Sequence, residues 1–136
     1  MIRQVEFRLR ARERGVHLVT DEVVAHLGSL PETGLLHLLV KHTSCGLALN
    51  ENYDPDVRHD MAVVMDQLVP EGNSRFRHTL EGRDDMPAHA KSVLSGVSLT
   101  IPITGHRLNL GTWQGIYLLE YRNAGGSRSI VATIVS

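Results

Sequence analysis

Residues 41–60, KHTSCGLALNENYDPDVRHD, come directly after the apolar segment GLLHLLV at residues 34–40. That segment is apolar on both faces, which is typical of a strand covered on both sides. A strand that is dry along its length and polar at its end holds functional groups on a rigid support. We therefore expect the candidate site to lie in residues 41–60, with the rest of the chain folded around it.

A helix is predicted directly after this polar stretch. Asp54 followed by Pro55 is a strong helix start, because proline at the first position needs no amide partner and aspartate accepts from the free amides. The helical period then continues to about Val69 and groups apolar residues on one face, namely Val57, Met61, Val64, Met65 and Leu68. Asp60 falls at the margin of this face, where a carboxylate needs a partner, whereas His59 points away.

The other segments predict further strands and short helices. Alternating apolar residues indicate strands at residues 2–10, 16–19, 97–103, 107–110, 115–122 and 129–135, the last four as an antiparallel meander. Thr20 can cap a helix in the first part of the chain. Residues 71–86 form a long polar loop, and a short helix follows at residues 87–95, capped by Asp84 or Asp85.

The composition fits a single domain spanning residues 1–136, with 42% hydrophobic and 21% charged residues. No apolar run approaches the roughly 20 residues that span a bilayer, so we expect a cytoplasmic protein without a membrane partner. A net charge of −1 and an aromatic content of 4% argue against nucleic-acid binding. The only cysteine, Cys45, cannot form an internal disulfide.

Three of the eight histidines are candidate metal ligands. His42, His78 and His89 come from a predicted strand end, loop and helix start, so they could converge on a metal ion that keeps an open position. No short motif such as HExxH fixes that arrangement. Each histidine could instead be a satisfied polar residue near a turn.

Two other chemistries are open from the residues alone. Donors near strand turns would suit phosphate: Lys91, Arg107, Thr112 and Gln114. Cys45 could act as a nucleophile with His42 as its base, but the two are three residues apart and would lie on opposite faces of an extended chain. Cys45 is better interpreted as a small packing residue beside Gly46.

Three long blocks of sequence, in order, resemble one known family. They are residues 42–60 (HTSCGLALNENYDPDVRHD), His78 with residues 81–103 (EGRDDMPAHAKSVLSGVSLTIPI), and residues 105–122 (GHRLNLGTWQGIYLLEYR). Together they are similar to the YjbQ-like family, also called the secondary thiamine-phosphate synthase enzyme family. The resemblance covers nearly the whole chain. It implies an α+β domain with antiparallel, sandwich-like sheets and three short helices, a homotrimer, and a weak thiamine-phosphate synthase activity that for many members need not be the main role.

The resemblance also implies site residues. The matching polar positions are His42, Thr43, Ser44, Asn50, Glu51, Asp60, His78, His89, Lys91, Arg107, Thr112, Trp113 and Gln114. The implied reaction joins a thiazole phosphate to a pyrimidine methyl diphosphate and releases pyrophosphate. Lys91 and Arg107 would bind the phosphates. The proposed metal ligands are His42, His78 and His89.

The remaining matched positions would support these groups. Glu51 and Asp60 would orient the histidines. Bound cofactor or substrate would contact Thr43, Ser44, Thr112 and Gln114. Position 45 departs from the family, whose block often continues with alanine, and this argues against a cysteine mechanism.

Other functions are compatible with the same residues. Histidine ligands suit zinc or another transition ion better than magnesium, whereas departure of pyrophosphate usually requires magnesium. This tension leaves two alternatives to the synthase. One is a metal-dependent hydrolase of a small phosphorylated or acylated metabolite, and the other is a non-catalytic trimer that binds a ligand or acts as a scaffold.

Overall fold

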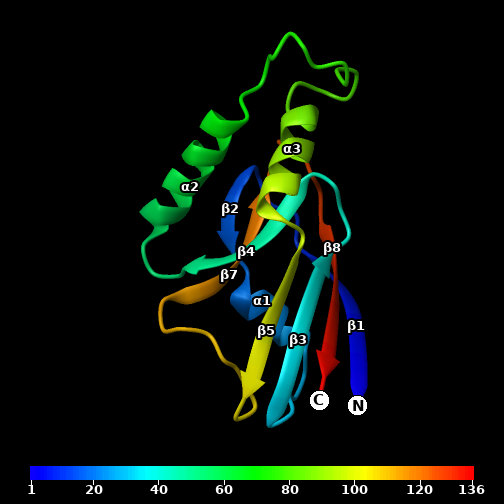
Figure 1. The fold of residues 1–136 in the computed structure, drawn as a ribbon, viewed down its shortest axis with the longest axis vertical. Helices are drawn as coiled ribbons and strands as arrows, with labels where there is room; N and C mark the ends of the chain where they lie inside the picture. Colours follow the sequence, from blue (N-terminus) through cyan, green and yellow to red (C-terminus); the bar gives the residue numbers. More distant parts are fainter.

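Two antiparallel sheets and three helices make up the computed structural model, which describes residues 1–136. The elements are, in order, β1 (Ile2–Leu9), β2 (Gly15–Leu18), α1 (Thr20–Ala25), β3 (Thr33–Val40), β4 (Cys45–Glu51), α2 (Pro55–Leu68), α3 (Asp85–Ser95), β5 (Ser98–Thr104), β6 (Arg107–Leu108), β7 (Gln114–Glu120) and β8 (Arg128–Val135). One sheet has the order β1-β8-β3-β5-β6 and the other β2-β7-β4. The predicted α+β fold class is confirmed, and α2 and α3 lie together at one end of the molecule (Figure 1).

The main core lies between the inner faces of the two sheets. Alternate residues of β3 and β8 point into it, among them Leu36, Leu38 and Ile130, and they meet Ile116 and Leu118 of β7. Each of these side chains is at most 1% exposed, so each contributes about 2 kcal/mol by leaving water. The core therefore supplies a rigid base beneath the loops that follow the strands.

The strand that is covered on both faces is β7, not β3 as predicted. In β3, Leu35 and Leu39 point away from the core and remain 46% and 37% exposed, because no element of the chain packs on that face of the five-stranded sheet. In β7, Ile116 faces the main core while Tyr117 packs into a second cluster beneath the helices. An apolar run alone cannot tell these two situations apart.

The helix α2 begins as predicted but buries less of its apolar face. The carboxylate of Asp54 accepts from the amide of Asp56 at 2.9 Å, with Pro55 as the first helical residue. Met65 is buried, whereas Val64 and Leu68 on the expected face are 46% and 64% exposed. The helix rests on the short strand β2 and projects beyond the sheet, which leaves its far end uncovered (Figure 1).

The helix α3 packs closely against β4, a strand that sequence periodicity did not indicate. A Cβ on Gly46 would lie 2.8 Å from the carbonyl oxygen of Gly96, so only glycine permits this approach. The hydroxyl of Ser92 also donates to the carbonyl of Cys45 at 2.7 Å. These contacts fix α3 relative to the loop that joins β3 to β4. None of the helices is long and apolar enough to cross a membrane.

Candidate metal-binding site

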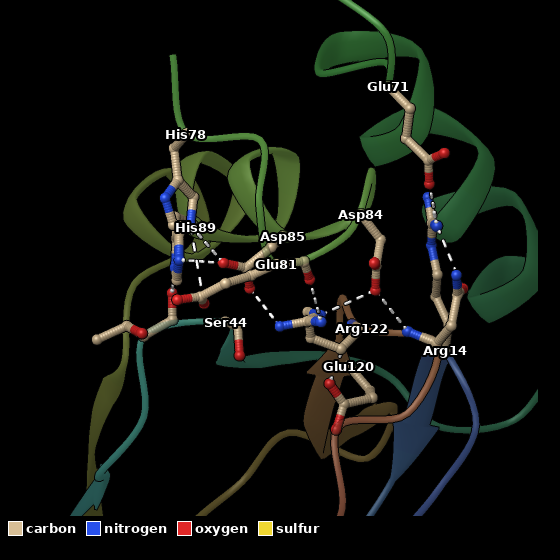
Figure 2. A network of polar contacts seen from close by, with 12 residues as sticks. Arg14, Ser44, Glu71, His78, Glu81, Asp84, Asp85, His89, Glu120 and Arg122 are labelled. Atoms are coloured by element: carbon tan, nitrogen blue, oxygen red, sulfur yellow. Dashed lines mark hydrogen bonds and ion pairs between the residues drawn. The ribbon is translucent and has the colours of Figure 1, made fainter. Parts of the chain in front are cut away.

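Three side chains converge at the N-terminal end of α3 (Figure 2). His78 comes from the long loop, Asp85 is the first residue of α3, and His89 lies one helical turn further on. The Oδ2 atom of Asp85 is 2.6 Å from Nε2 of His78 and 3.0 Å from Nε2 of His89. One potential ligand atom from each residue lies within 4.8 Å of the other two. Two imidazoles and one carboxylate thus point at a common centre.

The hydrogen bond on the other side of His89 determines what this nitrogen can do. Its Nδ1–H donates to the carbonyl oxygen of Thr43 at 2.8 Å, so in the neutral ring Nε2 carries the free lone pair. A neutral His89 therefore cannot also donate to Asp85. Either a second proton or a metal ion must occupy the space between Nε2 and the carboxylate. A backbone carbonyl behind the imidazole is the arrangement usual for a metal-ligating histidine, so these residues fit a metal ion.

The carboxylate of Asp85 is held in place from behind by Arg122. The guanidinium contacts Oδ1 of Asp85 through Nη1 and donates to Asp84 through Nε at 2.9 Å. Its Nη2 donates to the carbonyl of Glu81 at 3.0 Å. Burial opposes ionisation of Asp85, but the hydrogen bond from His78 and the charges of His89 and Arg122 outweigh it, so its pKa lies below the ordinary value. The site thus contains a carboxylate ligand that is ionised at neutral pH.

An open cleft of about 610 Å³ adjoins this centre and shares His89 with it. It is lined by His42, Thr43, His89, Ser92, Val93, Gly96 and Val97. The volume falls within the range of small-molecule sites, and the valines give it an apolar wall. A ligand in the cleft would lie against an imidazole of the cluster.

Comparison with known proteins assigns the chain to a family. The family described as "UPF0047 protein YjbQ-like" matches residues 5–136. The chain belongs to the YjbQ/UPF0047 family. The resemblance found in the sequence is thereby confirmed.

Individual relatives agree with this assignment. UPF0047 protein YjbQ of Escherichia coli O157:H7 is 51% identical over 133 residues, which cover 96% of each chain. The Salmonella typhimurium protein of the same name is 54% identical over 128 residues, 93% of this chain and 92% of its own. The crystal structure of conserved hypothetical protein TT1486 from Thermus thermophilus superposes with a TM-score of 0.82 at 37% identity, covering 93% of this chain and 97% of that one.

In this YjbQ-family chain, His42 is not part of the cluster. Its Nε2 accepts a hydrogen bond from the backbone amide of Ser129 at 2.8 Å, so the ring proton must sit on Nδ1. Neither nitrogen then offers a free lone pair to a metal ion. Burial and the nearby guanidinium of Arg128 lower the pKa of His42 and favour this neutral form. Asp85 occupies the third ligand position that the sequence assigned to His42.

The expected phosphate-binding cations are not brought together within one chain. Lys91 is 1% exposed and donates to Asp66 at 2.8 Å, with its ammonium 5.1 Å from the centre of the Tyr121 ring. Arg107 follows the end of β5 that points away from α3 (Figure 1). The structure therefore gives Lys91 a structural ion pair and leaves Arg107 distant from the histidines.

The other residues expected to contact a ligand, Thr112 and Gln114, form hydrogen bonds within the loops before β7 and after β4. The carbonyl of Thr112 accepts from the side chain of Asn52 at 3.1 Å, and the Gln114 side chain accepts from the amide of Gly111 at 2.8 Å. Gln114 pairs with Glu51 across the β4–β7 ladder. These residues lie at the end of the β4–β7 ladder opposite to Cys45, remote from the cluster.

The expected orienting carboxylates also act elsewhere. Glu51 accepts from the amides of Tyr53 and Asp54 before α2, at 2.5 and 3.0 Å. Asp60 contacts only the exposed His59. Neither carboxylate is hydrogen-bonded to a histidine of the cluster. The carboxylate that contacts His78 and His89 is that of Asp85.

The HTS block, residues 42–44, contributes one backbone contact to the metal-binding site. Thr43 orients His89 through its carbonyl, whereas the carbonyl of Ser44 accepts from Arg128 at 3.2 Å. Cys45 is fully buried and its pKa is raised to about 12 by burial, so it is inert as a nucleophile.

Two residues of the site, Asp85 and Arg122, were missed from the sequence. A signal for Asp85 was present, because an aspartate four residues before a histidine on a helix puts both on one face. The role expected for Asp85 was that of a cap. Arg122 carries no local signal, since it reaches Asp85 only through the packing of β7 against α3.

Proposed function

We propose that this chain is a metal-dependent enzyme whose centre is formed by His78, Asp85 and His89, and that its reaction is hydrolysis of a small phosphorylated or acylated metabolite. The observation that carries the proposal is the convergence of the two Nε2 atoms on Oδ2 of Asp85, with Thr43 orienting His89 from behind. A three-residue ligand set that leaves a coordination position open is typical of catalytic rather than structural metal sites.

The donor set supports zinc or another transition ion over magnesium. Two imidazole nitrogens with one carboxylate oxygen match the ligands of catalytic zinc, whereas magnesium and calcium prefer oxygen ligands alone. When bound, the ion would supply a Lewis acid that polarises the substrate and eases ionisation of water.

The protein residues have separate tasks around that ion. Arg122 keeps Asp85 ionised and aligned, so that the ligand does not require reorganisation during the reaction. Glu81 is a carboxylate outside the ligand set, with Oε2 3.9 Å from Nε2 of His78, and its side chain is 66% exposed. We assign it as the acceptor of the proton released from water.

Thiamine-phosphate synthase activity, which the sequence resemblance implies, is the competing proposal. The two cations that the resemblance assigns to its pyrophosphate leaving group are not at the cleft, because Lys91 is buried on Asp66 and Arg107 lies at the other end of the sheet. This distribution within one chain favours the hydrolase. A non-catalytic, ligand-binding trimer is the third proposal.

Elemental analysis together with activity assays distinguishes the three proposals. The purified, untagged protein is expected to hold close to one equivalent of zinc or a similar ion, which His78→Ala and Asp85→Asn lose. The exposed His59 is the matched control, and His59→Ala should keep the metal. Chelator-sensitive turnover of a panel of phosphoesters and esters would support the hydrolase. Complementation of a thiamine auxotroph would instead support the synthase, and metal-free wild type after reloading would overturn the metal-dependent proposals.

We also propose self-association, which the resemblance implies as a trimer. The outer face of the five-stranded sheet carries a group of exposed apolar side chains, Leu35, Leu39 and Val135, with exposed fractions of 46%, 37% and 41%. Leu35 and Val135 are direct partners across the β3–β8 ladder and form the centre of this apolar patch, and Leu39 lies on the same face beyond the His37–Thr133 pair. An uncovered apolar sheet face of this kind supports burial against another copy.

A further inference from the structure

His42 holds an unusual position at the end of the five-stranded sheet. The last backbone hydrogen bond between β3 and β8 runs from the amide of Lys41 to the carbonyl of Ser129, at 2.9 Å. The amide of Ser129 then donates to Nε2 of His42 at 2.8 Å, so the imidazole takes the place of the next backbone acceptor. This bond fixes both the orientation of the ring and its tautomer, with the proton on Nδ1.

The Nδ1–H group of His42 has no hydrogen-bond partner within the chain. The ring lines the cleft beside His89, and no carboxylate side chain lines that cleft. The charged groups that act on the ring are Arg128, Arg8 and Lys41 as cations and Glu120 as the one anion. Glu120 is already paired with Arg128 at 2.5 Å and Lys41 with Glu6 at 3.2 Å, so Arg8 is the cation near His42 that no carboxylate of the chain neutralises.

We propose that His42 is a substrate-binding residue, whose neutral Nδ1–H donates a hydrogen bond to an oxyanion of the phosphate class bound in the cleft. The inference rests on the proposed function in that it takes the cleft as the substrate site of the metal centre. A fixed donor beside a metal ligand would hold the anionic group while the reacting bond faces the ion. The donor keeps its proton throughout, because Nε2 is committed to Ser129.

Two substitutions separate a binding role of His42 from a structural role, because each places an amide group near a different nitrogen of the imidazole. His42→Gln puts an acceptor near the position of Nε2, so it keeps the bond to Ser129 but loses the donor in the cleft. His42→Asn keeps a donor near the position of Nδ1 and loses the bond to Ser129. A structural role and a binding role therefore predict opposite orders for the two variants.

The probe is inorganic phosphate, titrated calorimetrically into zinc-loaded and metal-free protein, with Tm measured in parallel. We expect phosphate affinity to fall about tenfold in His42→Gln, as for loss of one hydrogen bond to a charged group, at nearly unchanged Tm. His42→Asn should keep affinity within about threefold but have a lower Tm. Equal affinities, the reverse order, or no phosphate binding by the wild type would overturn the proposal. Acetate binding without phosphate binding would overturn the phosphate assignment.

A second measurement needs no variant and no metal. Long-range proton–nitrogen NMR spectra of the wild type should show His42 as the neutral Nδ1–H tautomer, and an Nε2–H or doubly protonated ring would contradict the proposal. The proposed metal centre and the proposed role of His42 can be refuted independently of each other. Absence of metal with phosphate binding that still depends on His42 refutes the metal centre alone, whereas stoichiometric metal with phosphate binding insensitive to His42→Gln refutes the role of His42 alone.

Discussion

The Nδ1–H of His89 donates to the carbonyl oxygen of Thr43 across 2.8 Å. This bond joins the first turns of α3 to the loop after β3, two segments that are far apart in sequence. It turns Nε2 of His89 toward Asp85 and leaves a lone pair there for a metal ion. The bond thus links the polar loop to the candidate centre without any side chain of that loop acting as a ligand.

Arg122→Gln should weaken metal binding about 10- to 100-fold, because Asp85 loses the group that aligns its carboxylate. Competition with a zinc-binding dye measures the effect. Arg83→Gln is the matched control, since Arg83 is exposed and only weakly paired with Glu71 at 4.0 Å. Unchanged zinc affinity in Arg122→Gln would show that Asp85 needs no support from behind.

Lys91 should be structural, and the variants of its ion pair should show this. Asp66→Asn leaves the buried ammonium without its anion and should cost about 2 kcal/mol, less than for a fully buried pair because the Asp66 side chain is 49% exposed. Lys91→Met removes the charge and should stay within about 1 kcal/mol of the wild type. Urea unfolding measures both. Loss of phosphate binding in Lys91→Met at unchanged stability would restore Lys91 to the site.

The pH dependence of stability should include a contribution from Glu22. Burial raises the pKa of this carboxyl, but hydrogen bonds from the Arg10 amide and the Arg12 side chain outweigh burial, so the net shift is downward. A lowered folded-state pKa means stability that is present above the unfolded value of about 4.3 and lost as the pH falls through the folded value.

Glu22→Gln should therefore be less stable than the wild type by about 1 kcal/mol at neutral pH, with the difference disappearing as the pH falls from neutral through the folded-state pKa of Glu22. Denaturant unfolding across this pH range measures it. Glu6→Gln, at an exposed pair with Lys41, should show a much smaller difference. A gap between wild type and Glu22→Gln that persists at low pH would contradict the assignment.

Gly46→Ala should destabilise the protein by about 2 kcal/mol, because the added methyl group meets the carbonyl of Gly96 and the side chain of Ser95. Since α3 carries two of the ligands, metal affinity should fall as well. Gly105→Ala meets no atom within 4 Å and has only the cost of a positive φ of 60°, about 1 kcal/mol. Full metal affinity in Gly46→Ala would show that the site tolerates movement of α3.

Leu39→Glu should disrupt self-association, because it puts a charge into the apolar patch on the outer face of the five-stranded sheet. Light scattering coupled to gel filtration gives the mass of the assembly. Leu80→Glu, at a loop residue that is 97% exposed, should leave the assembly intact. A wild type that runs as a monomer would refute the proposed assembly.

Local rules account for the elements that could be predicted. The Asp54–Pro55 pair placed the start of α2, and alternation placed β5, β7 and β8. The predicted meander was wrong, because β7 pairs with β2 and β4 in one sheet whereas β5 and β8 belong to the other. The local rules failed where the burial of a residue depends on a partner that is distant in sequence. The apolar run of β3 suggested cover on both faces, but the helices pack on β7 instead. The exposed Leu68 on α2 has the same cause, since no other element of the chain reaches it.

The sequence by itself determined the fold class, the family, and the two histidines, His78 and His89, that meet at the candidate centre. Only the tertiary structure decided that Asp85 completes the set, that His42 is committed to Ser129, and that Lys91 is paired with Asp66. The physical reason is that propensity and periodicity act over a few neighbouring residues. Which nitrogen or carboxylate is free depends on hydrogen bonds between segments that only packing brings together.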